Sequence, residues 1–291
     1  MADGKVTIET VLDSKDFNKA LNQLGSKTKS GLVLATKAIA ATATAVGGLA
    51  VAAVRSGIKF ESAFAGVKKT VDATDAQLAQ FRQGIRDMSK EMPSSAEAIA
   101  GVAEAAGQLG IKNENLLSFT KTMTMLGDAT NMSSDEAATS LARLANITGM
   151  SQSDFDKLGS TVVALGNNLA TTESEIVAMS MRIAGAGHQV GMTEAQIMSF
   201  SGALSSVGIE AEAGGTAFST LISKMSLAAQ TGGEQLEQFA KVAGMSADEF
   251  KASFEKDAAG AIITFIKGLD KINKNGGSAI KTLDDTVSYT H

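Results

Sequence analysis

Few residues in this sequence have side chains suited to catalysis or to metal binding. The chain contains no cysteine, and its two histidines are His188 and His291. Without cysteine there is no disulfide, no thiolate metal ligand and no cysteine nucleophile. A single histidine does not make a metal site without a second ligand. His188, between Gly187 and Gln189, is therefore interpreted as a helix-end or solvent-facing residue.

Two glycine-rich stretches have the composition of phosphate-binding loops, at Gly185-Ala186-Gly187 and at Gly214-Gly215-Thr216. Neither follows a convincing buried strand, and neither carries the lysine of a P-loop. We interpret Gly214-Gly215 as a flexible helix start. The acidic side chains have no partner base in a recognisable pattern and are assigned to solvated faces; they are Glu173, Glu175, Asp284 and Asp285. The sequence thus predicts no enzyme, no catalytic residue and no cofactor.

The elements that must carry these residues are predicted to be helices. Among 291 residues we count 47 alanines and 29 glycines, and Pro93 is the only proline. Alanine is the best helix former and proline the strongest helix breaker, so this composition favours an all-α fold of closely packed short helices. The charge balance of 26 basic against 31 acidic residues does not favour specific nucleic-acid recognition.

Helix ends are marked by two recurring patterns. Five capping boxes predict helix starts, at Ser94/Glu97, Ser133/Glu136, Thr172/Glu175, Thr193/Gln196 and Ser246/Glu249. Five glycines followed by a bulky apolar residue predict helix stops, at Gly110, Gly149, Gly191, Gly208 and Gly244. The predicted helices are 32–70, 75–91, 94–108, 114–129, 134–147, 152–167, 173–188, 194–206, 214–230, 234–242, 247–256 and 258–273. The uneven glycine spacing argues against a solenoid of fixed period.

Methionines recur on these helices, for example at Met123 and Met179. We interpret them as adaptable core residues, the alternative being a surface that binds metal or varied ligands.

The first 59 residues differ from the rest of the chain. Residues 5–12 are predicted to form a short strand, followed by a short helix and then by an apolar helix rich in Ala and Gly over 32–59. Within it, residues 38–54 are uncharged and near the lower length limit for crossing a bilayer. A row of small residues at Ala40, Thr44, Gly48 and Ala52 would let another helix approach closely. This seam serves either helix packing in an assembly or insertion into a membrane.

Three stretches resemble the N-terminal and core region of phage tail tape measure proteins. They are SGIKFESAFAGVKKTVDAT (56–74), QFRQGIRDMSKEMPSSAEAIAGVAEAAGQLGI (80–111) and MTEAQIMSFSGALSSVGIEAEAGGTAFSTLISKM (192–225). The resemblance divides the chain into a strand and short helix (1–31), the apolar helix (32–59), the tape measure core (60–230) and a helical C-terminal segment (231–291). Family members usually continue for hundreds of residues, so we interpret this last segment as truncated.

The resemblance implies a structural function. A tape measure protein sets the length of the tail tube during assembly and occupies the tube lumen until DNA is ejected. The implied partners are the tail tube protein, tail assembly chaperones and tail tip or baseplate proteins, with self-association into a homo-oligomer. The implied locations are the virion tail and, during assembly, the host cytoplasm, with membrane contact at ejection. The alternative function is a membrane-active helical protein that inserts or forms a pore through residues 38–54.

Overall fold

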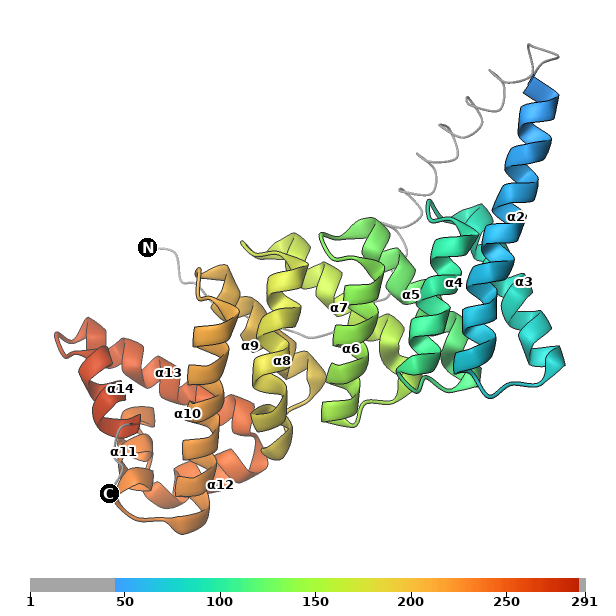
Figure 1. Ribbon diagram of the computed structural model, residues 1–291. Coiled ribbons are helices and arrows are strands. Elements are labelled where there is room, and N and C mark those ends of the chain that lie inside the picture. Colours follow the sequence, from blue (N-terminus) through green and yellow to red (C-terminus); the bar gives the residue numbers. More distant parts are fainter. Residues whose placement is uncertain (1–44, 288–291) are drawn as a thin grey trace. The chain divides into compact units, whose positions relative to one another are not determined.

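The computed structural model describes the backbone of residues 45–287, and the side chains from Arg55 onward except that of Asp285. Every regular element in this range is helical, and no strand occurs in it (Figure 1). The predicted all-α fold is therefore confirmed for these residues. The predicted strand at 5–12, the short helix after it and the first part of the apolar helix lie outside the described residues.

The chain divides into two compact units, each with its own internal contacts. Unit 1 comprises residues up to Asn168 together with Thr172–Ser174, and unit 2 comprises Leu169–Thr171 and the residues from Glu175 onward. The helices of unit 1 are α2 (Ala45–Thr70), α3 (Asp75–Glu91), α4 (Ala96–Gln108), α5 (Asn113–Ala129), α6 (Ser134–Thr148), the single turn η1 (Gln152–Asp154) and α7 (Phe155–Asn168). The helices of unit 2 are α8 (Glu173–Gln189, which starts in unit 1), α9 (Glu194–Ser206), α10 (Ala211–Thr231), α11 (Glu234–Ala243), α12 (Ala247–Lys256), α13 (Ala258–Lys274) and α14 (Ala279–Val287).

Unit 1 is a stack of helices in two layers. Helix α4 packs against α2 and α6 in one layer, and α5 packs against α3 and α7 in the other. Successive helices also pack across the layers, α3 on α4, α4 on α5 and α5 on α6. The core between the layers contains fully buried Phe119 and Leu141, and the Phe119 and Phe155 rings meet edge to face at 4.6 Å.

Side-chain amides join successive corners of unit 1. Gln152 donates to the Gly110 carbonyl at 3.1 Å and accepts from the Lys112 N–H at 2.8 Å. At another corner, Asn131 donates to Ser174 Oγ at 2.7 Å and accepts from the Ser174 N–H at 3.2 Å. The bonded residues lie 40 to 43 positions apart. The same corner arrangement therefore repeats about every two helices in unit 1, although the sequence has no fixed period. The uneven glycine spacing did not indicate this repetition.

The predicted helix stops are confirmed. All five glycines have positive φ, between 70° and 81°. In each case the apolar residue that follows donates its N–H to a carbonyl five positions back, as when Met150 bonds Ala145 at 3.0 Å and Met245 bonds Ala240 at 2.9 Å. These are the bonds of a Schellman ending, which satisfies carbonyls that the helix leaves unpaired.

We expect replacement of Gly191 by valine to lower the free energy of unfolding by ~1 kcal/mol or more, because φ at this position is +77° and a β-branched residue is strained there. The matched control is Gly101→Ala inside α4, where an added Cβ would meet no atom within 4 Å. It should be neutral or slightly stabilising. Thermal melts of the two variants measure the difference, and the opposite ranking would contradict the assigned helix end.

The predicted helix starts are largely confirmed, with one shift. Complete capping boxes occur at Thr193/Gln196 and Ser246/Glu249, and Ser133 accepts the Glu136 N–H. Helix α8 begins directly after Thr172. At α4 the predicted cap was wrong by one residue: Ser95 caps the helix, because the Ser94 hydroxyl donates to Asp128 at 2.8 Å instead. A sixth box, Thr74/Gln77 at the start of α3, was not predicted.

The Ser246/Glu249 box makes helix α12 sensitive to acid. The Ser246 N–H and hydroxyl both donate to Glu249 Oε2, at 2.8 and 2.9 Å, and hold the pKa of this carboxyl below its usual value. The stability that this box contributes is therefore present above the usual glutamate pKa of about 4.3 and is lost as the pH falls through the lower, folded-state value.

The check is Glu249→Gln, which keeps a box of the Thr193/Gln196 type but removes the titrating group. We expect the stability of the wild type relative to this variant to fall between about pH 5 and pH 2. Urea unfolding across this range measures it, and a difference independent of pH would contradict the assignment.

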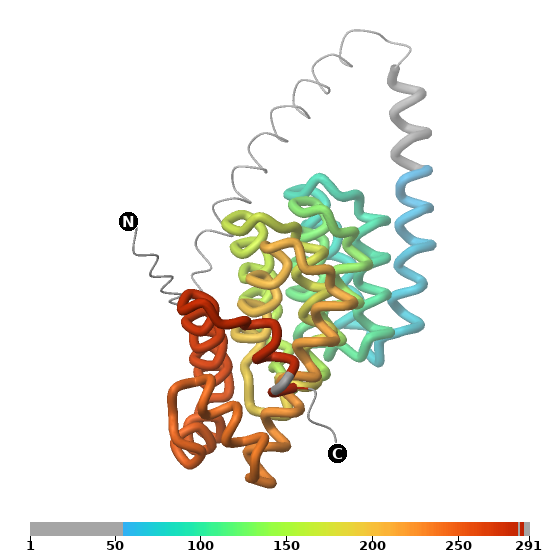
Figure 2. The backbone as a smooth tube through the Cα atoms, turned by 90° about the vertical axis from the view of Figure 1, so that its left-hand side faces the viewer, coloured from blue at the N-terminus to red at the C-terminus, as the bar shows by residue number. Residues whose placement is uncertain are grey.

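Unit 2 has one continuous core, formed by residues of α8 to α13. Helices α11, α12 and α13 pack against one another (Figure 2), and the Phe239 ring meets Phe250 at 6.2 Å and Phe265 at 5.5 Å. Helix α14 was not predicted. Its first turn is capped by Ser278, whose hydroxyl accepts the Lys281 N–H at 3.1 Å.

Candidate functional site

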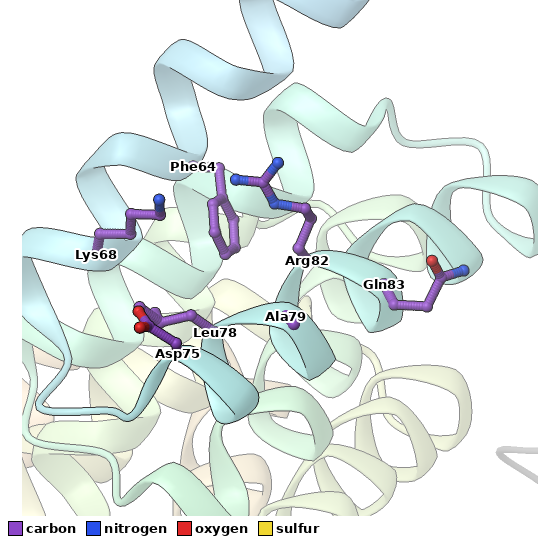
Figure 3. A pocket seen from close by; sticks show the side chains of 7 residues that line it. All are labelled: Phe64, Lys68, Asp75, Leu78, Ala79, Arg82 and Gln83. Atoms are coloured by element: carbon purple, nitrogen blue, oxygen red, sulfur yellow. The ribbon is translucent and has the colours of Figure 1, made fainter.

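A pocket of about 340 Å³ lies between helices α2 and α3 in unit 1 (Figure 3). Phe64, Leu78 and Ala79 form its apolar lining. Polar and charged side chains complete the wall; they are Lys68, Asp75, Arg82 and Gln83. Phe64 and Lys68 belong to α2, and the other five lining residues belong to α3 (Figure 3).

Helical spacing on both sides builds this pocket. On α2, Phe60, Phe64 and Val67 recur one turn apart and are all buried. The connection after α2 spans four residues and ends at Thr74, whose hydroxyl caps α3. Helix α3 thereby returns along α2, and residues one turn apart on it face residues one turn apart on α2.

The wall of the pocket continues into an array that we name the Arg–Phe brace: Phe60, Phe64, Arg82, Arg86 and Glu61. The Arg82 guanidinium lies 4.9 Å from the Phe64 ring centroid, and that of Arg86 lies 4.8 Å from Phe60. Both arginines donate to the same oxygen of Glu61, at 2.9 and 3.2 Å. The brace therefore joins α2 to α3 by two cation–π contacts and one shared carboxylate.

The brace is a packing device and does not resemble a catalytic centre. Its ion pairs are between 35% and 46% exposed, where such pairs contribute only about 0–1 kcal/mol each. The arginines also cover rings that are 3% and 1% exposed, so removing either one would uncover apolar surface. The pocket offers an ammonium, a guanidinium and an amide as donors and the Asp75 carboxylate as an acceptor, which suits the binding of a polar group.

The residues singled out from the sequence do not come together at this pocket. Ala40 and Thr44 of the seam lie outside the described residues, whereas Gly48 and Ala52 belong to the backbone of α2. His188 is exposed in the last turn of α8. Among residues 45–287, no three His, Asp or Glu side chains are grouped to hold a metal ion, and no helix is both long and apolar enough to cross a membrane.

The interpretation of Gly214-Gly215 as a flexible helix start was wrong. Helix α10 begins at Ala211, and both glycines lie inside it. An added Cβ at Gly214 would overlap the Ile209 side chain, and one at Gly215 would meet Arg182 at 2.5 Å. Their small size permits close packing. The methionine interpretation fits the structure, because Met123 and Met179 are fully buried.

The Arg–Phe brace was not predicted from the sequence. Its signal was two pairs at helical spacing, Phe60/Phe64 and Arg82/Arg86, on consecutive helices. Each pair alone is common on helix surfaces, and only the return of α3 along α2 shows that the two pairs meet.

Comparison with known proteins gives one match. The family model described as phage-related minor tail protein matches residues 82–283, more than two thirds of the chain. The matched range contains helices α4 to α13 completely, whereas α2 precedes it. No curated protein and no solved structure gave a match. Members of this family are structural and typically non-enzymatic, and the chain accordingly belongs to the phage-related minor tail protein family as a structural component of a phage tail.

Proposed function

We propose that the chain is a tape measure protein, which sets the length of the tail tube during assembly and occupies its lumen until DNA is ejected. The observation that carries this proposal is the tail-protein family match over 82–283. It coincides with two of the stretches that resemble tape measure cores, 80–111 and 192–225, almost completely. The long helix α2, which leads into this region, suits a protein whose length is read along a helix axis.

The proposal includes a set of partners. The tail tube protein would surround the chain, assembly chaperones would hold it before the tube forms, and tail tip or baseplate proteins would anchor one end. Copies of the chain would associate with one another, and contact with the host membrane would follow at ejection.

Tail length tests this function directly. An insert of 28 helix-forming residues after Val287 leaves both units intact, and in a helix it adds about 42 Å at 1.5 Å per residue. We expect phage that carry this gene to form tails longer by this amount in electron micrographs. The control is an insert of the same length and composition in a phage gene outside the tail gene cluster. Tails of unchanged length, with the lengthened chain present in the particles, would refute the proposal.

The seam is tested separately by Gly48→Leu. A bulky side chain in a small-residue row should weaken self-association, whereas the added hydrophobicity should preserve or increase membrane binding. We expect wild-type chains to associate in detergent-free buffer and the variant to associate about tenfold more weakly, with Gly48→Ala close to the wild type. Analytical ultracentrifugation and vesicle flotation measure both properties. A wild-type chain that is monomeric and floats with vesicles would favour the membrane-active alternative.

A further inference from the structure

The turn between α13 and α14 contains the one Asn-Gly pair of the sequence, Asn275-Gly276. Asn275 ends α13 with φ −89° and ψ 15°, and it is exposed. Gly276 has φ +81°, and a Cβ added to it would meet no atom within 4 Å. A second glycine, Gly277, follows. The pair thus combines an accessible side-chain amide with an unhindered backbone nitrogen.

We propose that Asn275 is a site of spontaneous deamidation and that the reaction loosens helix α14. The Gly276 nitrogen attacks Cγ of Asn275, the side-chain nitrogen leaves as ammonia, and a five-membered succinimide forms. Water then opens either carbonyl of the ring and gives aspartate or isoaspartate. The sequence of steps consumes one water, releases one ammonia and needs no oxidant or reductant. Glycine favours the attack because no side chain shields its nitrogen.

The fold slows this reaction without blocking it. The Gly276 N–H donates to the Asn273 carbonyl at a long 3.2 Å, and ψ of Asn275 must rotate from 15° before the nitrogen faces Cγ. Because Gly276 and Gly277 are exposed and conformationally permissive, a local opening of this turn is sufficient. The folded chain therefore reacts more slowly than a free peptide of the same sequence, and faster than at its other asparagines.

The product is unfavourable at this position for two reasons. A carboxylate at residue 275 lies at the C-terminal end of α13, where the helix dipole is negative. Isoaspartate also adds a methylene group to the backbone, which displaces the Gly277 N–H from the Ile272 carbonyl that it bonds at 3.0 Å. Both changes weaken the turn that leads into α14.

Helix α14 is held mainly at its C-terminal end, where Thr286 is buried and Val287 packs against the core of unit 2. Its C-terminal carbonyls accept from Lys224 and Gln235, at Val287 and Thr286 respectively. Nearer its start, Ile280 and Leu283 are 83% and 37% exposed, so this half of the helix contributes little buried surface. An element attached mainly at one end opens locally when its other end is disturbed.

Peptide mapping of the full chain during incubation at mildly alkaline pH tests the chemistry. We expect loss of the Asn275 amide, with isoaspartate as a product, before any other asparagine reacts. Asn275→Gln should slow the loss at least about tenfold, since glutamine would need a larger ring while the Gly276 conformation is unchanged. An Asn275 that stays intact while the free peptide 271–281 deamidates would overturn the proposal.

Hydrogen exchange on the same samples tests the consequence. We expect exchange of residues 279–287 to rise about fivefold after deamidation, with α8 unchanged as an internal reference. Incubated Asn275→Gln should show no rise. Unchanged protection of α14 in the fully deamidated chain would refute the loosening, even if the chemistry occurs.

Discussion

Replacing Phe239 by alanine is expected to lower the free energy of unfolding of unit 2 by ~3–5 kcal/mol, the usual cost of removing a fully buried ring. Phe239 has no exposed surface and contacts both Phe250 on α12 and Phe265 on α13. The ring is therefore the point at which three helices meet. Phe239→Leu retains part of the volume and should lose markedly less.

Urea unfolding followed by circular dichroism measures this effect, and hydrogen exchange assigns the transition to unit 2. The control is Leu227→Ala on α10, whose side chain is 56% exposed and whose removal should change stability by no more than about 0.5 kcal/mol. A Phe239→Ala chain within about 1 kcal/mol of the wild type would mean that the three helices do not share this core.

The second large effect is expected at Gly268, on α13. A Cβ at this position would overlap the backbone carbonyl of Val242, near the end of α11. A carbonyl cannot rotate away as a side chain can, so the two helices must separate. We expect Gly268→Ala to destabilise unit 2 by ~2–3 kcal/mol.

The matched control is the same substitution in the C-terminal half of α8. At Gly185 an added Cβ would meet nothing within 4 Å, so Gly185→Ala should stabilise by up to ~1 kcal/mol through helix propensity alone. If the same Gly→Ala substitution destabilises at one position and stabilises at the other, the effect of close packing is separated from that of helix propensity. Equal effects of the two substitutions in thermal melts would show that α11 and α13 do not approach closely.

Local signals explain why most helices were predictable. Helices 75–91, 194–206 and 247–256 coincide with α3, α9 and α12 residue for residue, because their starts and stops are fixed by groups within one turn. Helix α14 was missed because it is short and Ser278 is followed three residues later by Lys281, which does not complete a capping box. Only an acid or a glutamine at this position completes a capping box.

Tertiary contacts explain what could not be predicted. The choice of Ser95 over Ser94 depends on Asp128, which lies in another helix. The role of Gly215 depends on Arg182 of α8, and the Arg–Phe brace depends on the return of α3 along α2. In each case the deciding partner lies in another helix. The spacing of residues within one helix therefore cannot show which of two possible arrangements forms.

The two-layer stack of unit 1 has a mechanical consequence. Its principal helix contacts join only helices that are one or two places apart in the chain. A pulling force on one terminus therefore loads one helix pair at a time, and each pair must resist alone. Rupture then proceeds as a series of small events rather than one large one, so the unit can unfold helix pair by helix pair as it passes through a narrow opening.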